Sequence, residues 1–398
     1  MNYYIKSTKV CFSDQIKPAI IHIENGNFKD ILDYNHNIDA IDYGDNFIMP
    51  GLFDSHTHGY AGYSFTSTST VDDILEVLKL YASMGVTSIL ASSSVTGYRS
   101  IIEATKRKGA AKILGIHAEG PFLNDKRYGI AKPGTKFLRP DIEIVKELIK
   151  SSNDLIKVMT IAPEVIGAID VIKYLKENNI KVAIGHTDAT YQQFKEFVSY
   201  LDIATHVGNT MTGMHHRDIG VLGGLMLSNI PVELITDGIH ISHDMMAIMF
   251  KLKSIEDFIF VSDFTPLSGL SVGEYQLDYT KVKINKEGQV INEFGHLTGS
   301  SKGQLEGIKS IYSLFDFPLY KVINAATLNP AKLYDFDDEI GSISQGKKAD
   351  YIIVDNDFNL QFTFLEGECV FEYKNEIIKE NPKLKEVMTR KEFLSFYK

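Results

Sequence analysis

The sequence predicts an α/β protein: a (β/α)8 barrel of the TIM type with a small β-sandwich domain formed from both ends of the chain. Three observations lead to this prediction. The chain has 398 residues, and a barrel with its loops uses roughly 250 or more of them as one unit. Eight short apolar runs alternate with amphipathic helical patterns in the middle of the chain. Both ends instead have the composition of β-strands.

The two ends of the chain are predicted to build one β domain. YYIKSTKVCF and AIIHIENGNFKDIL are rich in β-branched and aromatic residues, and Asn25-Gly26 is a turn signal. Strand patterns return after Ile343 in KKADYIIVD, LQFTFLEG and ECVFEYKNEII. We therefore expect a β domain from residues 1–49 and 345–385, a barrel at 50–344 inserted between them, and a terminal helix at 386–398.

The predicted barrel strands are the eight apolar runs FIMPGLFDSHTH, VTSILASS, KILGIHAEG, IKVMTIAPE, IKVAIGHT, LDIATHV, VELITDGIH and FIFVSDF. Helical patterns such as VDDILEVLKLYASMG and AIDVIKYLKENN lie between them, and each ends in Gly or Asn, as helices often do. Strands that alternate with helices favour a parallel sheet, and eight units favour its closure into a barrel.

Composition restricts the class of protein. Hydrophobic residues make up 44% and charged residues 23%, which excludes a disordered chain. The formal charge of -10 argues against nucleic acid and anionic membranes as partners, but a small anionic substrate needs only a local basic pocket. We expect no signal peptide and no membrane span. The two cysteines, Cys11 and Cys369, are expected to be free thiols in a reducing cytoplasm.

His56 and His58 end the first predicted barrel strand. Two residues apart on a strand, their side chains leave the same face and can chelate one metal ion. The alternative is a pair of hydrogen-bonded barrel histidines. Further polar residues at other strand ends favour the metal, because catalytic residues of a barrel gather at this rim.

Glu119, His186 and His206 end the third, fifth and sixth predicted strands. A carboxylate at a barrel mouth is costly without a partner, and a divalent cation or an Arg can be that partner. The three side chains form a ligand set that leaves a position for water, as catalytic sites require. Nitrogen and oxygen ligands predict one or two divalent ions: zinc first, with iron, manganese and cobalt as alternatives.

Asp263 ends the last predicted strand. It can be a metal ligand, or it can accept the proton of a metal-activated water and return it to a leaving amine. The alternative is a helix cap, because Thr265-Pro266 follows.

Four residues are candidates for substrate binding. Arg217 has the geometry to bind phosphate or carboxylate, or it is an exposed loop charge. His240 follows the seventh predicted strand. Asn209 and Thr210, in the segment GNT, can present backbone N–H groups to an anion.

The chain contains the segments MPGLFDSHTHG, IAPE and TDGIHI, and also NPAKLY followed by IGSISQGKKAD. These segments resemble the amidohydrolase superfamily. Three further segments are HAEGPFL, GHTDAT and the RxxG that begins at Arg217. They are similar to one family of that superfamily, the N-acetylglucosamine-6-phosphate deacetylases. The resemblance covers nearly the whole chain. It implies metal-dependent hydrolysis of the acetamide of N-acetylglucosamine 6-phosphate to glucosamine 6-phosphate and acetate. It also implies Asp263 as the acid-base residue, and a homodimer in which Arg217 and His240 contact the phosphate in the neighbouring subunit's site.

One segment departs from this resemblance. The family has a His in a segment like GAHNP, whereas this chain reads GIAKP, with Ala131 at the His position and Lys132 beside it. The sugar and acyl specificity therefore stay open. The alternatives are another N-acyl amino sugar phosphate, a different amidohydrolase substrate, and a relative that binds a sugar phosphate without turnover.

Overall fold

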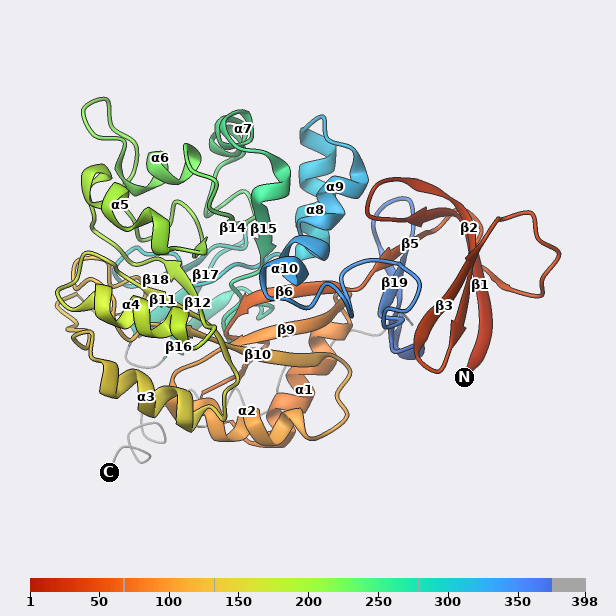
Figure 1. Ribbon diagram of the computed structural model, residues 1–398, viewed down its shortest axis with the longest axis horizontal. Helices are drawn as coiled ribbons and strands as arrows, with labels where there is room; N and C mark the ends of the chain where they lie inside the picture. The colour runs from red at the N-terminus through yellow and green to blue at the C-terminus, as the bar shows by residue number, and fades with distance from the viewer. Residues whose placement is uncertain (67–68, 132, 278–279, 374–398) are drawn as a thin grey trace.

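The structure is a computed structural model that describes residues 1–66, 69–131, 133–277 and 280–373. Figure 1 shows a barrel surrounded by helices and, at its side, a smaller β domain that carries the N-terminus. Lys132, the last part of the predicted β domain (374–385) and the predicted helix at 386–398 lie outside the described residues.

The barrel sheet is eight-stranded and parallel, and its strands follow one another in chain order. Each predicted apolar run contributes one strand to this sheet, so the predicted fold class is confirmed. The first run also contains Phe47–Pro50, which forms a strand of the β domain instead. The strands are β6 (Leu52–Thr57), β9 (Val86–Ser92), β10 (Lys112–Glu119), β11 (Ile156–Ile161), β12 (Lys181–Ile184), β13 (Ile203–Ala204), β14 (Val232–Ile235) and β15 (Phe258–Val261).

Hydrogen bonds join the first and last strands and so close the barrel. The Asp263 N–H donates to the His56 carbonyl over 2.9 Å, and the His58 N–H donates to the Phe264 carbonyl over 2.7 Å. The buried Asp54 carboxylate accepts from the Ser262 N–H at 3.1 Å. Closure brings His56, His58 and Asp263 to the same part of the rim.

A helix follows each barrel strand and covers the outside of the sheet (Figure 1). In α1, Thr70 and Asp73 form a capping box, and Ile74, Val77 and Tyr81 are buried at helical spacing. Both helices predicted by sequence form, as α1 and α4. The eight helices are α1 (Val71–Ala82), α2 (Tyr98–Thr105), α3 (Ile142–Ser151), α4 (Ala168–Glu177), α5 (Tyr191–Phe197), α6 (Gly220–Met226), α7 (His243–Leu252) and α8 (Gln304–Leu314). Two short helices, α9 (Leu319–Asn324) and α10 (Leu328–Leu333), follow them.

Apolar side chains pack in two layers around the barrel sheet. The larger cluster joins the strands to the surrounding helices. A smaller cluster takes residues from around the barrel, such as Phe53 and Ile235, and packs them against Ala331 and Tyr334 at the end of α10. This inner packing fills one end of the barrel with apolar side chains. The polar residues at the other end of the strands therefore lie at the open rim.

The β domain is one sheet of strands from both ends of the chain, in the order β21-β20-β19-β5-β1-β2-β3, with β4 also paired to β1. The sheet curls over its own apolar core, because the Phe28 N–H at the start of β3 donates to the Lys347 carbonyl just before β19. The strands are β1 (Asn2–Cys11), β2 (Ile16–Glu24), β3 (Asn27–Leu32), β4 (Ile41–Asp42), β5 (Phe47–Pro50), β19 (Tyr351–Val354), β20 (Leu360–Leu365) and β21 (Glu368–Glu372).

Two small sheets were not predicted. Three antiparallel strands, β16 (Gly273–Leu277), β17 (Thr280–Ile284) and β18 (Val290–Asn292), form an insertion between β15 and α8. In β17, Val282 and Ile284 are buried and alternate with exposed lysines. The second is a hairpin of β7 (Gly59–Tyr60) and β8 (Tyr63–Ser64) just after β6.

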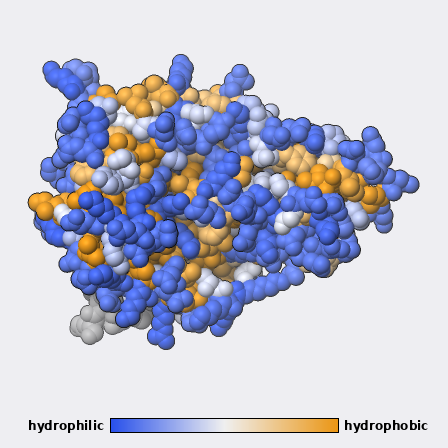
Figure 2. All heavy atoms as spheres, viewed as in Figure 1, coloured by the Kyte–Doolittle hydropathy of each residue, from blue (hydrophilic) through white to orange (hydrophobic). Residues whose placement is uncertain are grey.

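Hydrophilic side chains cover most of the face in Figure 2, with hydrophobic patches between them. No helix within the described residues has the length and apolar character needed to cross a membrane.

Candidate metal centre

His56 and His58 point to one place at the end of β6, as their spacing predicts. Their Nε2 atoms lie 3.3 Å apart. The Asp263 Oδ1 atom, after β15, lies 3.7 Å from His56 Nε2 and 3.5 Å from His58 Nε2. These three ligand atoms form a group in which one metal ion fits.

Glu119, His186 and His206 form a second group beside the first. The Glu119 Oε1 atom is 3.0 Å from the Nε2 atom of each histidine, and the two nitrogens are 3.2 Å apart. The other oxygen, Oε2, lies 3.3 Å from His58 Nε2. One carboxylate therefore contacts both groups, and all five residues predicted as metal ligands come together with Asp263.

The backbone aims these side chains. His186, His206 and Asp263, each just after a barrel strand, have φ angles of 47°, 27° and 49°. Residues other than Gly seldom adopt this left-handed backbone conformation, and where they do they are concentrated at functional sites. It turns the chain sharply where the strand ends, so the side chain points over the barrel axis.

The hydrogen bonds around the histidines fit a bound cation. His186 Nδ1 lies 2.7 Å from the Arg127 carbonyl, to which it can only donate. In the neutral ring the Nε2 lone pair then faces Glu119, so two acceptors would meet at 3.0 Å. Either a second proton on the ring or a divalent cation between the two atoms removes the conflict, and a ring N–H bonded to a carbonyl is the usual support of a metal-binding His.

The charges of the centre are strongly coupled. Burial alone would raise the pKa of Glu119, but the hydrogen bonds from His186 and His206 hold it well below its ordinary value. Burial would lower the pKa of His56, but the carboxylates of Glu233 and Asp263 raise it well above its ordinary value. Carboxylates thus favour positive charge at this point of the barrel, as they would at a cation site.

A cavity of ≈ 620 Å³ opens above the centre. Its lining includes Asn209, Thr210 and His240, three of the predicted substrate residues, together with Ala131. His240 Nδ1 is 2.7 Å from the buried Asp237 carboxylate. Burial would lower the pKa of His240, but this carboxylate raises it, so the ring favours positive charge.

Arg217, the fourth predicted substrate residue, lies elsewhere. It is exposed in the loop between β13 and α6 and is not among the described residues that line the cavity of its own chain.

Sequence reasoning missed several residues near the centre. Arg127, Tyr128 and His296 also line the cavity. Glu233 lies buried in the barrel, in contact with His56. His117, which sequence reasoning placed at a strand end without a role, is also buried there beside His56. The signal for Glu233 was a single charged residue inside the apolar run VELI. His296 follows the unpredicted insertion, so no strand end pointed to it.

The profile of the amidohydrolase family matches residues 285–377. This segment contains the end of the insertion, the last helices and the return to the β domain. The match covers less than half of the chain, and together with the barrel and the centre at its rim it indicates the amidohydrolase class.

Relatives narrow this class. The N-acetylglucosamine-6-phosphate deacetylase of Vibrio furnissii is 33% identical over 362 residues, which are 88% of this chain and 90% of that protein. The N-acetylgalactosamine-6-phosphate deacetylase of Escherichia coli O157:H7 is 30% identical, over 81% of this chain and 87% of that protein. The solved structure of the Thermotoga maritima N-acetylglucosamine-6-phosphate deacetylase has a TM-score of 0.80 and 26% identity, over 93% of this chain and 100% of that one. The chain therefore belongs to the N-acetylglucosamine-6-phosphate deacetylase family, and the resemblance seen in the sequence is confirmed.

Proposed function

We propose that the protein hydrolyses the acetamide bond of N-acetylglucosamine 6-phosphate to give glucosamine 6-phosphate and acetate. The observation that carries this proposal is the meeting of Glu119, His186 and His206 with Asp263 at the base of the cavity. The names of the relatives support the same substrate.

The proposed cofactor is one or two divalent ions, with zinc as the first candidate and iron, manganese or cobalt as alternatives. Glu119, His186 and His206 would hold the first ion, and His56 and His58 would contribute to a second. Such an ion lowers the pKa of a bound water and polarises the amide carbonyl.

Asp263 is the proposed acid-base residue. Its Oδ1 atom faces the histidines of the centre. It accepts the proton of the attacking water and returns it to the nitrogen of the leaving amine. The free amino sugar then leaves, and acetate is the second product.

Asn209, Thr210 and His240 are proposed to bind the sugar phosphate, since they line the cavity. The positive charge favoured at His240 suits a phosphate. Arg217, exposed on its own chain, is proposed to reach the neighbouring subunit's site in a cytoplasmic homodimer. His240 was expected to do the same, but it lines the cavity of its own chain and is proposed to act there.

A second candidate substrate is another N-acyl amino sugar phosphate. Two observations favour it: Ala131 lines the cavity at the position of the family His, and one relative is named for N-acetylgalactosamine 6-phosphate.

The test is acetate release from a panel of N-acetylated sugars, each with and without a 6-phosphate. We expect turnover of N-acetylglucosamine 6-phosphate and a large loss without the phosphate. Faster acetate release from another N-acylated sugar phosphate would show that this other compound is the substrate. Tight binding of the panel with no acetate released would show a sugar-phosphate-binding protein that is not an enzyme.

A further inference from the structure

Glu233 is a carboxylate inside the barrel that the proposed reaction does not use. It lies in β14, and its side chain has no exposed surface. An ionised carboxylate in such a place loses its hydration and persists only when other groups compensate for the loss. Its partners therefore indicate why it is there.

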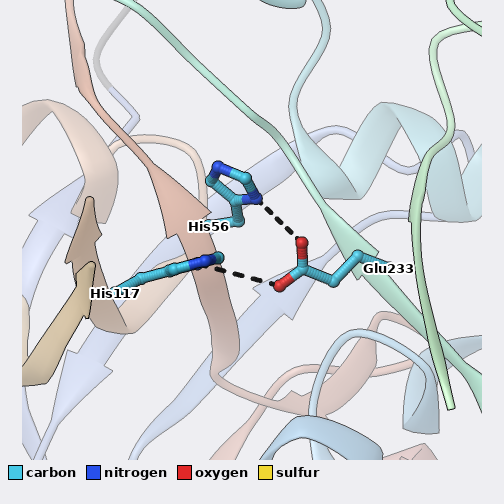
Figure 3. A group of neighbouring side chains, drawn as sticks. All are labelled: His56, His117 and Glu233. Carbon is cyan, nitrogen blue, oxygen red and sulfur yellow. Dashed lines mark hydrogen bonds and ion pairs between the residues drawn. The ribbon is translucent and has the colours of Figure 1, made fainter. Parts of the chain in front are cut away.

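One of these partners is a metal-ligand candidate. The Glu233 Oε2 atom lies 2.8 Å from His56 Nδ1 (Figure 3). A carboxylate can only accept here, so Nδ1 carries a proton, and in the neutral ring the His56 Nε2 lone pair faces His58 and Asp263. That tautomer is the one a metal ion requires.

The same oxygen also contacts the second ligand group. The His206 backbone N–H donates to Glu233 Oε2 over 3.2 Å, at a residue with the left-handed φ of 27°. One carboxylate oxygen thus holds the ring of His56 and the backbone of His206. The other oxygen, Oε1, accepts no hydrogen bond from the described residues and has His117 Nδ1 at 3.9 Å.

We propose that Glu233 is a positioning residue that joins the two ligand groups. It fixes the metal-binding tautomer of His56 and the backbone turn at His206, and its charge strengthens the binding of divalent ions. The ion at His56 and His58 depends on it most, because Glu233 contacts that ligand ring directly. This inference rests on the metal dependence proposed above.

The test is metal binding rather than turnover. Metal-free wild type and Glu233→Gln are titrated with Co²⁺, and the visible absorption and bound-metal stoichiometry are followed. The Gln side chain keeps the size, and its carbonyl oxygen can still accept from His56, so the variant removes the charge and replaces the Oε1 atom by an NH2 group. We expect the weaker of two Co²⁺ sites to lose about 10–100-fold in affinity, with a smaller change at the other. Asp350→Asn is the matched control: it removes another buried carboxylate, in the β domain beside Lys112, and should bind Co²⁺ like wild type.

Glu233→Asp provides a second variant that keeps the buried charge. Its shorter side chain cannot hold both His56 and His206, so we expect the same site to weaken. If Glu233→Gln and Glu233→Asp both fold and both bind two Co²⁺ ions with wild-type affinity and spectrum, the positioning role is wrong. Should Glu233→Gln fail to fold, the Asp variant alone decides. A wild type that binds no divalent ion would overturn the metal-dependent function as well, whereas normal wild-type binding with unchanged variants overturns this inference only.

Discussion

Three side chains of the candidate centre, His186, His206 and Asp263, depend on an unfavourable backbone conformation. Left-handed φ angles in residues other than Gly cost of order 1–3 kcal/mol each, and the closed barrel around them must supply this energy. A change that loosens the closed barrel would therefore release this conformation and move the three side chains.

At the residue scale, Glu119 is the side chain that both ligand groups share. Glu119→Gln keeps its shape but removes the negative charge between three histidines. We expect a loss of bound metal of about 100-fold or more in affinity, measured by elemental analysis after dialysis at fixed free metal. Glu103→Gln, on the exposed face of α2, is the control and should keep its metal. Full metal occupancy in the Glu119 variant would remove it from the ligand set.

A second residue-scale prediction concerns Ala131. If His56 and His58 hold an ion that polarises the substrate carbonyl, that ion takes the place of the imidazole missing at Ala131. We expect the double variant His56→Gln/His58→Asn to lose roughly two to three orders of magnitude in acetate release, the range that one polarising group supplies. Adding Ala131→His to the double variant should restore part of the loss.

The assay compares wild type, the double variant and the triple variant on N-acetylglucosamine 6-phosphate. Near-normal turnover by the double variant would show that the second ion is dispensable. If wild type ignores this sugar and hydrolyses another N-acyl compound, Ala131 instead belongs to a changed substrate pocket.

At the scale of elements, the segment between β10 and α3 covers the centre. The Arg127 carbonyl binds His186, and the Asn124 N–H donates to the His186 carbonyl over 3.0 Å. Gly129 completes this cover: a Cβ added there would lie 2.8 Å from His186 Cε1. The segment thus supports the ligand ring as well as lining the cavity.

Gly129→Ala is expected to displace the His186 ring and to weaken metal binding about tenfold, with a parallel loss of acetate release. Gly134→Ala is a matched control in the same segment. Gly134 also has a positive φ, +84°, but its Cβ would meet nothing within 4 Å. Both variants carry backbone strain, so only the contact with His186 distinguishes them. Equal effects of the two substitutions would mean that strain alone matters.

The elements were predictable where one physical signal dominated. The eight barrel strands are buried on both faces, so they appear in the sequence as apolar runs, and helix ends such as those of α1 carry local capping signals. The strands β16–β18 were missed because they are short and half exposed. The ligands were predictable from their place at strand ends. Glu233 was not, because its role depends on residues brought together only by barrel closure.

At the scale of the whole molecule, the family resemblance implies a dimer, and the exposed position of Arg217 leaves it accessible to a second subunit. We expect a dimer in sedimentation at micromolar concentration, and a raised KM for the sugar phosphate in Arg217→Ala. An equal mixture of Arg217→Ala and Asp263→Asn chains should restore activity up to roughly a quarter of wild type. Half of randomly formed dimers are mixed, and in each of these one of the two sites has both Arg217 and Asp263. A fully active monomer, or no recovery on mixing, would remove the cross-subunit role.

The pairing of β5 with β19 also bears on how the chain is made. Tyr351 pairs with Pro50 and Val354 with Phe47. At translation rates of roughly 5–20 residues per second, β5 waits about 15–60 seconds for the partner strand encoded about 300 residues later. Throughout that interval, on the ribosome, Ile48 and Met49 belong to a strand with an open hydrogen-bonding edge, the kind that recruits strands from neighbouring nascent chains. We therefore expect the late arrival of one four-residue strand to reduce yield during rapid expression, and a chaperone that shields the first fifty residues to raise it.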